Sequence, residues 1–176
     1  MPRVSLRSFL LTCLVALPLV LSAADQRIVV FKGQRRLELQ TDSNVTKTYR
    51  IGLGFEPTGP KTKQGDGRTP EGTYYVCVKN AHSQYYLSLG LSYPGPTDAA
   101  PALAAGTITK AQHAAILAAH KKRATPPWNT ALGGEVFIHG KGSGSDWTLG
   151  CIALDDADMK ELFATVANGT AVEIRP

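Results

Sequence analysis

The chain has 176 residues, of which 43% are hydrophobic and 19% are charged, and its formal net charge is +5. This length suits one domain better than two, and the hydrophobic share excludes a chain that is disordered throughout. Three cysteines are too few for a small scaffold held by disulfides.

The first 24 residues have the pattern of a secretory signal peptide. Arg3 and Arg7 precede an apolar run over residues 9–21, and small residues at 22–24 offer a cleavage site before Asp25. The run is shorter than the roughly 20 residues that span a bilayer, so a membrane anchor is the weaker alternative. We therefore expect cleavage and a mature protein outside the cytoplasm, in the periplasm or cell wall.

Loss of the signal peptide changes the charge that the mature chain carries. Residues 1–24 hold two arginines and no acid, so their removal lowers the net charge from +5 to +3. The longest basic run is residues 121–123, and no aromatic residues alternate with it. This excludes the dense basic face of a nucleic-acid-binding protein. No other segment is apolar enough for stable membrane insertion.

The pattern of apolar residues after residue 24 predicts a mainly β (α+β) fold with a few helices. We expect a single domain over residues 25–176. Expected strands cover residues 26–31, 36–40, 45–53, 73–78, 85–91, 136–138 and 171–174, and expected helices cover 107–120 and 155–166. Residues 56–72 are a polar loop rich in glycine and proline, and loops of that length are commonly functional.

Three of these elements carry more detailed predictions. Alternation in the third strand places Val45, Lys47, Tyr49 and Ile51 on one face. The helix over 107–120 has a capping box formed by Thr109 and Gln112 and a weak apolar stripe, whose members are Ile108, Ala111, Ala115 and Ala118. The helix over 155–166 is amphipathic and begins with aspartates, which its dipole favours.

Metal binding has little support in the sequence. His113 and His120 share a face of the first helix, but two histidines without a third ligand do not make a metal site. We expect no metal and no organic cofactor.

The segment over residues 136–154 places reactive side chains in a suggestive order. An apolar strand ends at His139, a glycine-rich stretch follows, and Gly150 comes directly before Cys151. An imidazole can take the proton of a thiol, and main-chain N–H groups beside the nucleophile can bind an oxyanion. Cys151 is therefore a candidate nucleophile. The alternatives are a structural buried thiol, or a Cys77–Cys151 disulfide, although Cys77 lies inside an expected buried strand.

Several stretches together resemble the L,D-transpeptidase catalytic domain of the YkuD type. They are residues 65–72 (GDGRTPEG), 89–94 (LGLSYP), 138–140 (IHG), 148–152 (TLGCI), 158–162 (DMKEL) and 168–172 (NGTAV). The resemblance covers essentially residues 26–175, and the stretches are in the order that the family shows.

The resemblance implies a fold, a reaction and roles for four residues. The fold would be a β-sandwich with a few helices, and the substrates would be peptidoglycan stem peptides. Cys151 would be the nucleophile and His139 its base, with the Gly140 carbonyl orienting the imidazole. The N–H groups of Gly150 and Cys151 would line the oxyanion hole. A thioester would form on a tetrapeptide stem, and a neighbouring amine would resolve it into a 3→3 cross-link or attach a protein to the wall.

The sequence departs from the family at one position. Many members carry an arginine two residues after the cysteine, where this chain has Ala153. Relatives that lack this arginine include enzymes that hydrolyse the link between peptidoglycan and an anchored lipoprotein. Hydrolysis by an L,D-endopeptidase or carboxypeptidase is therefore the alternative reaction. A non-catalytic wall-binding module with the Cys77–Cys151 disulfide is the alternative of another class.

Four further residues are candidate substrate contacts: Arg68, Tyr93, Trp147 and Thr148. Arg68 lies in the long polar loop and can pair with a carboxylate of a stem peptide. For the others the structural alternatives are a packed edge for Tyr93 and an anchor of the loop for Trp147.

Overall fold

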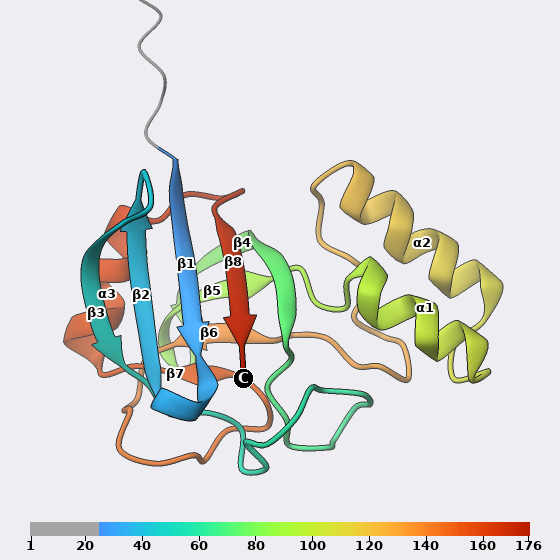
Figure 1. Ribbon diagram of the computed structural model, residues 1–176, viewed down its shortest axis with the longest axis horizontal. Helices are drawn as coiled ribbons and strands as arrows, with labels where there is room; N and C mark the ends of the chain where they lie inside the picture. The colour runs from blue at the N-terminus through green and yellow to red at the C-terminus, as the bar shows by residue number, and fades with distance from the viewer. Residues whose placement is uncertain (1–24) are drawn as a thin grey trace, which may run out of the picture.

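The chain folds into a mainly β structure, as expected, with three α-helices, and the computed structural model describes residues 25–176. The elements are β1 (Gln26–Phe31), a 3-10 turn (Lys32–Gln34), β2 (Arg36–Thr41), β3 (Asn44–Arg50), β4 (Gly72–Ser83), β5 (Tyr86–Leu91), α1 (Pro96–Ala104), α2 (Lys110–Lys121), β6 (Phe137–His139), β7 (Ile152–Ala153), α3 (Asp156–Thr165) and β8 (Ala171–Arg175) (Figure 1). The expected signal peptide lies outside the described residues.

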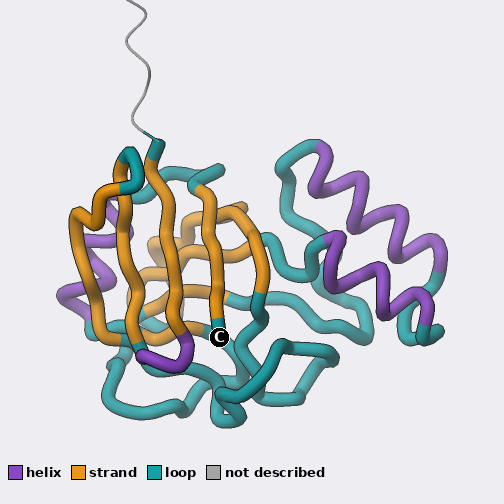
Figure 2. The backbone as a smooth tube through the Cα atoms, in the orientation of Figure 1, coloured by secondary structure: helices purple, strands orange, loops and turns teal. Residues whose placement is uncertain are grey.

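The strands form one continuous sheet that folds over itself at β4. Their order is β3-β2-β1-β8-β4-β5-β6-β7. The first part of β4, residues 72–75, pairs with β8, whereas its later part pairs with β5. Figure 2 shows β5, β6 and β7 running across behind β1, β2, β3 and β8. The result is a two-layered arrangement in which apolar side chains of both layers face each other.

The core lies between these layers and under α3. Fully buried members include Ile28, Leu37, Leu89, Ile138 and Ile174. From α3, Met159 and Leu162 complete the packing, and the helix contacts β5. The strand that ends at His139 is therefore held on both sides, by β5 and by β7.

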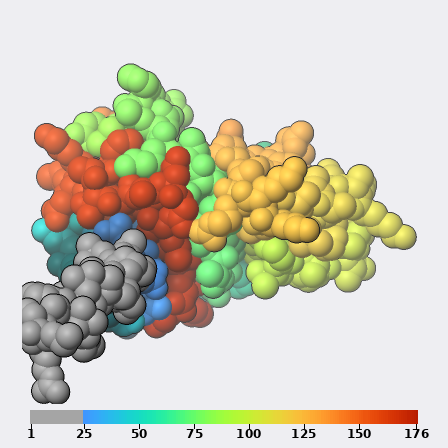
Figure 3. All heavy atoms as spheres, turned by 90° about the horizontal axis from the view of Figure 1, so that it is seen from above, coloured from blue at the N-terminus to red at the C-terminus, as the bar shows by residue number. Residues whose placement is uncertain are grey.

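Helices α1 and α2 pack against each other at one side of the sheet, where they project from the β body (Figures 1 and 3). Ile108, just before α2, and Ile116, within α2, are both buried. His120 donates from Nε2 to the Ser92 carbonyl, 2.8 Å away, which ties α2 to the end of β5. No helix among residues 25–176 is both long and apolar enough to cross a membrane.

The expected strands and both expected helices are present, with shifts of a few residues at their ends. The predicted face of β3 is wrong, because Val45 is 52% exposed while Tyr49 is buried. The register of β3 on β2 shifts between Leu39 and Gln40, whose partners are Lys47 and Val45. This bulge removes the strict alternation on which the prediction rested.

The helical segment departs further from the sequence pattern. The capping box of Thr109 and Gln112 is confirmed, with reciprocal bonds of 2.9 and 3.1 Å. The predicted stripe is wrong, because its three alanines are exposed and Ile116 is the side chain that α2 buries. Helix α1 was not expected, and Pro101 inside it is unfavourable for a helix.

Candidate active site

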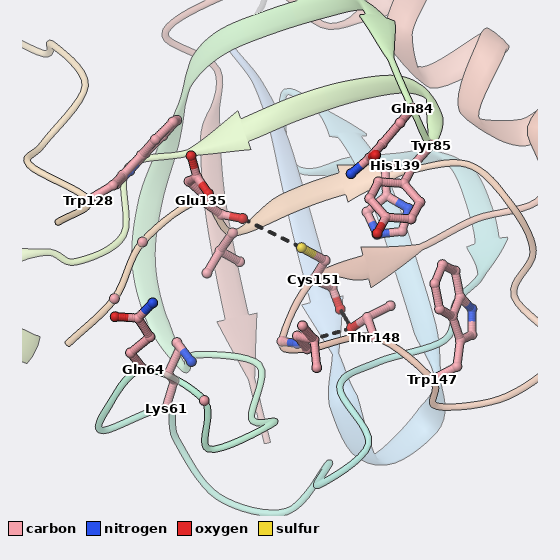
Figure 4. A pocket seen from close by; sticks show the side chains of 16 residues that line it. Lys61, Gln64, Gln84, Tyr85, Trp128, Glu135, His139, Trp147, Thr148 and Cys151 are labelled. Atoms are coloured by element: carbon pink, nitrogen blue, oxygen red, sulfur yellow. Dashed lines mark hydrogen bonds between the residues drawn. The ribbon is translucent and has the colours of Figure 1, made fainter. Parts of the chain in front are cut away.

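A cavity of about 500 Å³ opens where four segments of the chain meet. The segments are the long loop before β4, the turn between β4 and β5, the stretch between α2 and β6, and the loop between β6 and β7. The lining side chains are Lys61, Gln64, Gln84, Tyr85, Trp128, Glu135, Val136, His139, Trp147, Thr148, Leu149 and Cys151, with glycines 65, 133, 134 and 150 (Figure 4). The structure thus brings His139 and Cys151 to one cavity.

His139 ends β6 with its side chain buried to 2% exposure. Its Nδ1 lies 2.7 Å from the carbonyl oxygen of Gly140. A carbonyl only accepts, so Nδ1 carries the hydrogen and Nε2 of the neutral ring holds the free lone pair. Burial lowers the pKa of the imidazole, and the bond to Gly140 only partly offsets this. The ring is therefore a neutral base at neutral pH.

Two aromatic side chains fix the plane of this imidazole. Tyr85 stacks on His139 with ring centroids 4.8 Å apart, and Trp147 meets the ring edge-on at 5.6 Å. The Trp147 indole donates to the Gly142 carbonyl at 3.1 Å, and the Tyr85 carbonyl accepts from Gly140 N–H at 3.0 Å. Such packing holds a base in one orientation.

Cys151 precedes β7 and presents its sulfur to the same cavity. Sγ accepts from the Phe137 N–H at 3.4 Å and donates to the Glu135 carbonyl at 3.6 Å. Figure 4 shows the sulfur turned toward Glu135, with the His139 ring on the other side of Cys151. Burial raises the pKa of the thiol, which the Phe137 N–H and the Lys61 charge counter in part. The resting state is a neutral thiol.

Gly150 is required by the path of the chain into Cys151. Its φ is +127°, and a Cβ there would lie 2.6 Å from the Arg68 carbonyl oxygen. The Gly150 N–H donates to Thr148 Oγ1 at 3.1 Å, and Thr148 Oγ1 donates to the Cys151 carbonyl at 2.8 Å. Thr148 therefore orders the turn before Cys151, the candidate nucleophile. One of the two N–H groups expected for the oxyanion hole is engaged with Thr148.

The loop between β6 and β7 is tied down at three points. Asp156 accepts from Lys141 N–H at 2.8 Å, and Asp155 accepts from Ser143 N–H at 2.9 Å. Asp146 accepts from Arg35 and from Leu53 N–H. The glycine-rich stretch is consequently an ordered support for Trp147.

Both described cysteines are free thiols. Cys77 donates to the Gly90 carbonyl at 3.3 Å inside the sheet, while Cys151 faces the cavity. The Cys77–Cys151 disulfide of the alternative hypothesis is thus not formed.

The model of the YkuD family, described as the L,D-transpeptidase catalytic domain, matches residues 25–174. The chain belongs to this family. No curated protein matches it.

Solved structures share the fold of this L,D-transpeptidase domain. The helical cell shape determining protein Pgp2 from Campylobacter jejuni is 22% identical with a TM-score of 0.60, over 88% of this chain and 48% of that one. An L,D-transpeptidase from Mycobacterium smegmatis is 12% identical with a TM-score of 0.51, over 87% of this chain and 59% of that one. An L,D-transpeptidase from Xylanimonas cellulosilytica is 13% identical, also with a TM-score of 0.51, over 91% of this chain and 65% of that one. The chain spans less than two thirds of each of these structures.

Two of the candidate substrate contacts lie away from the cavity of this L,D-transpeptidase domain. Tyr93 is fully buried, with its hydroxyl donating to the Leu132 carbonyl at 3.1 Å, so it is a core residue. Arg68 lies beside Gly59, whose Cβ would come within 3.3 Å of its guanidinium. Trp147 and Thr148 do line the cavity.

Most of the other side chains that line the cavity were not predicted from the sequence. Trp128, Glu135 and Lys61 come from segments that were expected to be connections, whereas Tyr85 is the first residue of the strand expected over 85–91. The position of Tyr85 at the start of that expected strand gave no sign that its ring would cover His139. Lys61 lies in the loop that was singled out as functional, although Arg68 was the residue chosen there.

Proposed function

We propose that this domain forms a thioester between Cys151 and a peptidoglycan stem peptide, with His139 as the general base. The observation that carries the proposal is the tautomer of His139. The Gly140 carbonyl takes the Nδ1 hydrogen, so Nε2 is ready to accept a proton in the cavity that Cys151 shares. Membership of the L,D-transpeptidase family supports an acyl-transfer reaction on such stems.

In the first step the Cys151 thiol leaves the Glu135 carbonyl, turns to the imidazole and gives its proton to Nε2. The sulfur then attacks the carbonyl carbon of the third stem residue, which is usually a diamino acid. The negative charge on the carbonyl oxygen is stabilised by the Cys151 N–H, because Gly150 N–H is already directed at Thr148. His139 returns the proton to the departing amine of the terminal D-alanine, and a thioester remains.

An acceptor resolves the thioester in the second step. His139 takes a proton from an attacking amine, which gives a 3→3 cross-link or a protein attached to the wall. When water attacks instead, the outcome is hydrolysis, as in an L,D-carboxypeptidase or in an endopeptidase that releases an anchored lipoprotein. Ala153 favours this second candidate, since it is fully buried in β7 where many relatives have arginine.

The proposed place of action is outside the cytoplasm, after cleavage of residues 1–24. It follows from the signal-like sequence of these residues and from the wall substrates of the family. The mature unit would then be residues 25–176.

Mass analysis of muropeptides tests the reaction. The mature protein is incubated with disaccharide tetrapeptides, with Cys151→Ala as the matched control. D-Alanine is released in either case, so new dimers that lack one D-alanine identify a transferase, whereas tripeptides without dimers identify a hydrolase. If the wild-type protein changes no muropeptide more than Cys151→Ala does, the proposed function is wrong.

A further inference from the structure

Lys61 is a buried cation in the wall of the candidate active site. Its side chain is only 4% exposed, yet it lines the cavity beside Gly150 and Cys151. Its Nζ would lie 3.7 Å from a Cβ placed on Gly150. A charged group that is taken out of water to this extent needs compensating partners.

The partners of Lys61 leave one of its donors free for a ligand. Nζ donates to the Lys63 carbonyl at 3.0 Å and to Asp66 Oδ1 at 2.8 Å. A lysine ammonium has three N–H donors, so two are used by these contacts. Figure 4 shows the end of Lys61 directed into the cavity near Gln64.

Asp66 does not depend on Lys61 alone. Its carboxylate also accepts from the main-chain N–H groups of Thr62, Lys63 and Arg68, at 2.8 to 3.1 Å. Burial by itself raises the pKa of Asp66, but the hydrogen bonds from Lys61 and from these N–H groups lower it to about 2. Asp66 therefore stays ionised and holds the ammonium in place.

No other lysine or arginine lines this cavity in the part of the chain that the structure describes. The position two residues after the nucleophile holds Ala153, which is fully buried. A substrate carboxylate that enters the cavity thus finds one fixed cation, Lys61, and one carboxylate residue, Glu135, on another wall. Ion pairing in such a sheltered site is stronger than at the surface.

We propose that Lys61 binds a carboxylate of the donor stem and so determines which stems this site accepts. This inference rests on the proposed function. The carboxylate comes from the terminal D-amino acid or from the side chain of a diamino acid such as diaminopimelate at the third position. Stems that lack it would bind more weakly.

Peptide binding to Cys151→Ala protein tests this without requiring turnover. Isothermal titration compares a tetrapeptide stem that contains diaminopimelate with its C-terminal amide and with a stem that has lysine at the third position. One of the two altered stems should bind about ten-fold more weakly, the effect of losing one charge-assisted hydrogen bond. The stem affected identifies the carboxylate.

Variants at position 61 assign the preference to the side chain. Lys61→Met should reduce the preference to less than two-fold, whereas Lys61→Arg should retain part of it. Lys63→Met, an exposed neighbour, is the matched control and should behave like the parent. Thermal unfolding checks that each variant is folded.

Equal binding of all three stems to the Cys151→Ala parent would overturn the inference even if Lys61→Met does not fold. The inference would also be overturned if Lys61→Met kept the preference for the stem that carries the carboxylate. Turnover of stems by the wild-type protein without any carboxylate preference would reject only the role of Lys61. Absence of both turnover and binding would reject the proposed function as well.

Discussion

The Nδ1 atom of His139 donates to the carbonyl oxygen of Gly140 across 2.7 Å, and this single bond fixes the tautomer of the candidate base. The bond is made within two consecutive residues at the end of β6, so the strand that places the imidazole also orients it. Tyr85 and Trp147 then cover the ring. A base held in this way is ready before substrate arrives.

Replacement of His139 tests its role in proton transfer. His139→Ala should slow acylation of Cys151 by a carbapenem about 10²- to 10⁴-fold, which is the usual contribution of a general base. Stopped-flow absorbance or intact-protein mass measures the rate. His113→Ala removes a histidine of α2 outside the cavity and should leave the rate unchanged. Unchanged acylation in folded His139→Ala would remove His139 from the mechanism.

The dependence of acylation on pH follows from the burial of the His139 imidazole and the Cys151 thiol. In the proposed mechanism the neutral imidazole is the active form, and burial lowers the pKa of His139. Acylation should therefore rise with pH through a midpoint below about 6.5, the ordinary value, and stay level through neutral pH. Burial also raises the pKa of the Cys151 thiol. In the His139→Ala protein, the rate of alkylation by iodoacetamide should therefore begin to rise only above about pH 8.5, the ordinary value for a thiol. A midpoint above 7 would contradict a neutral imidazole base whose pKa is lowered by burial.

Gly150→Ala tests the turn that leads into Cys151, the proposed nucleophile. The new Cβ would stand 2.6 Å from the Arg68 carbonyl oxygen, at a φ of +127°. Strain of this kind costs about 1–3 kcal/mol, so the free energy of unfolding should fall by at least that much. Gly144→Ala is the control, because nothing lies within 4 Å of its Cβ, and it should change stability by less than about 0.5 kcal/mol. Urea unfolding of both proteins compares them, and equal stability would contradict the described turn.

Asp146→Ala tests the support of the loop that carries Trp147. Asp146 accepts from Arg35 Nε at 2.9 Å and from Leu53 N–H at 2.9 Å. Because the two charged side chains are 36% and 22% exposed, solvent weakens their pairing, and we expect a loss of about 1–2 kcal/mol. Glu173→Ala breaks an exposed pair with Arg175 and should cost no more than about 0.5 kcal/mol. Carbapenem acylation should slow in Asp146→Ala only, and an unchanged rate there would show that the loop does not depend on this contact.

Much of the fold was predictable because its elements have periodic sequences. The helix that became α3 buries Met159 and Leu162 as its spacing indicates, and β1 and β8 follow their apolar runs. The face of β3 was not predictable, because a bulge is a property of two strands together. Helix α1 was missed because its packing against α2 outweighs the unfavourable Pro101.

The residues of the candidate site also fall into those that the sequence predicted and those that only the tertiary fold brings to the cavity. His139, Gly150 and Cys151, which line one cavity, were singled out from the sequence because they lie close together in it and match a family pattern. Lys61 and Tyr85 were missed because they reach the cavity from distant segments, which only the tertiary fold brings together. Tyr93 was misassigned because a sequence does not distinguish a buried hydroxyl bonded to Leu132 from one that faces substrate.

The most direct test of the account is the mass of the protein during reaction with a tetrapeptide stem. Rapid quenching in acid should trap an adduct equal to the stem without its terminal D-alanine, and peptide mapping should place it on Cys151. Cys77→Ala should form the same adduct, and Cys151→Ala none. Turnover of the stem by Cys151→Ala, or an adduct on another residue, would contradict a thioester mechanism at Cys151.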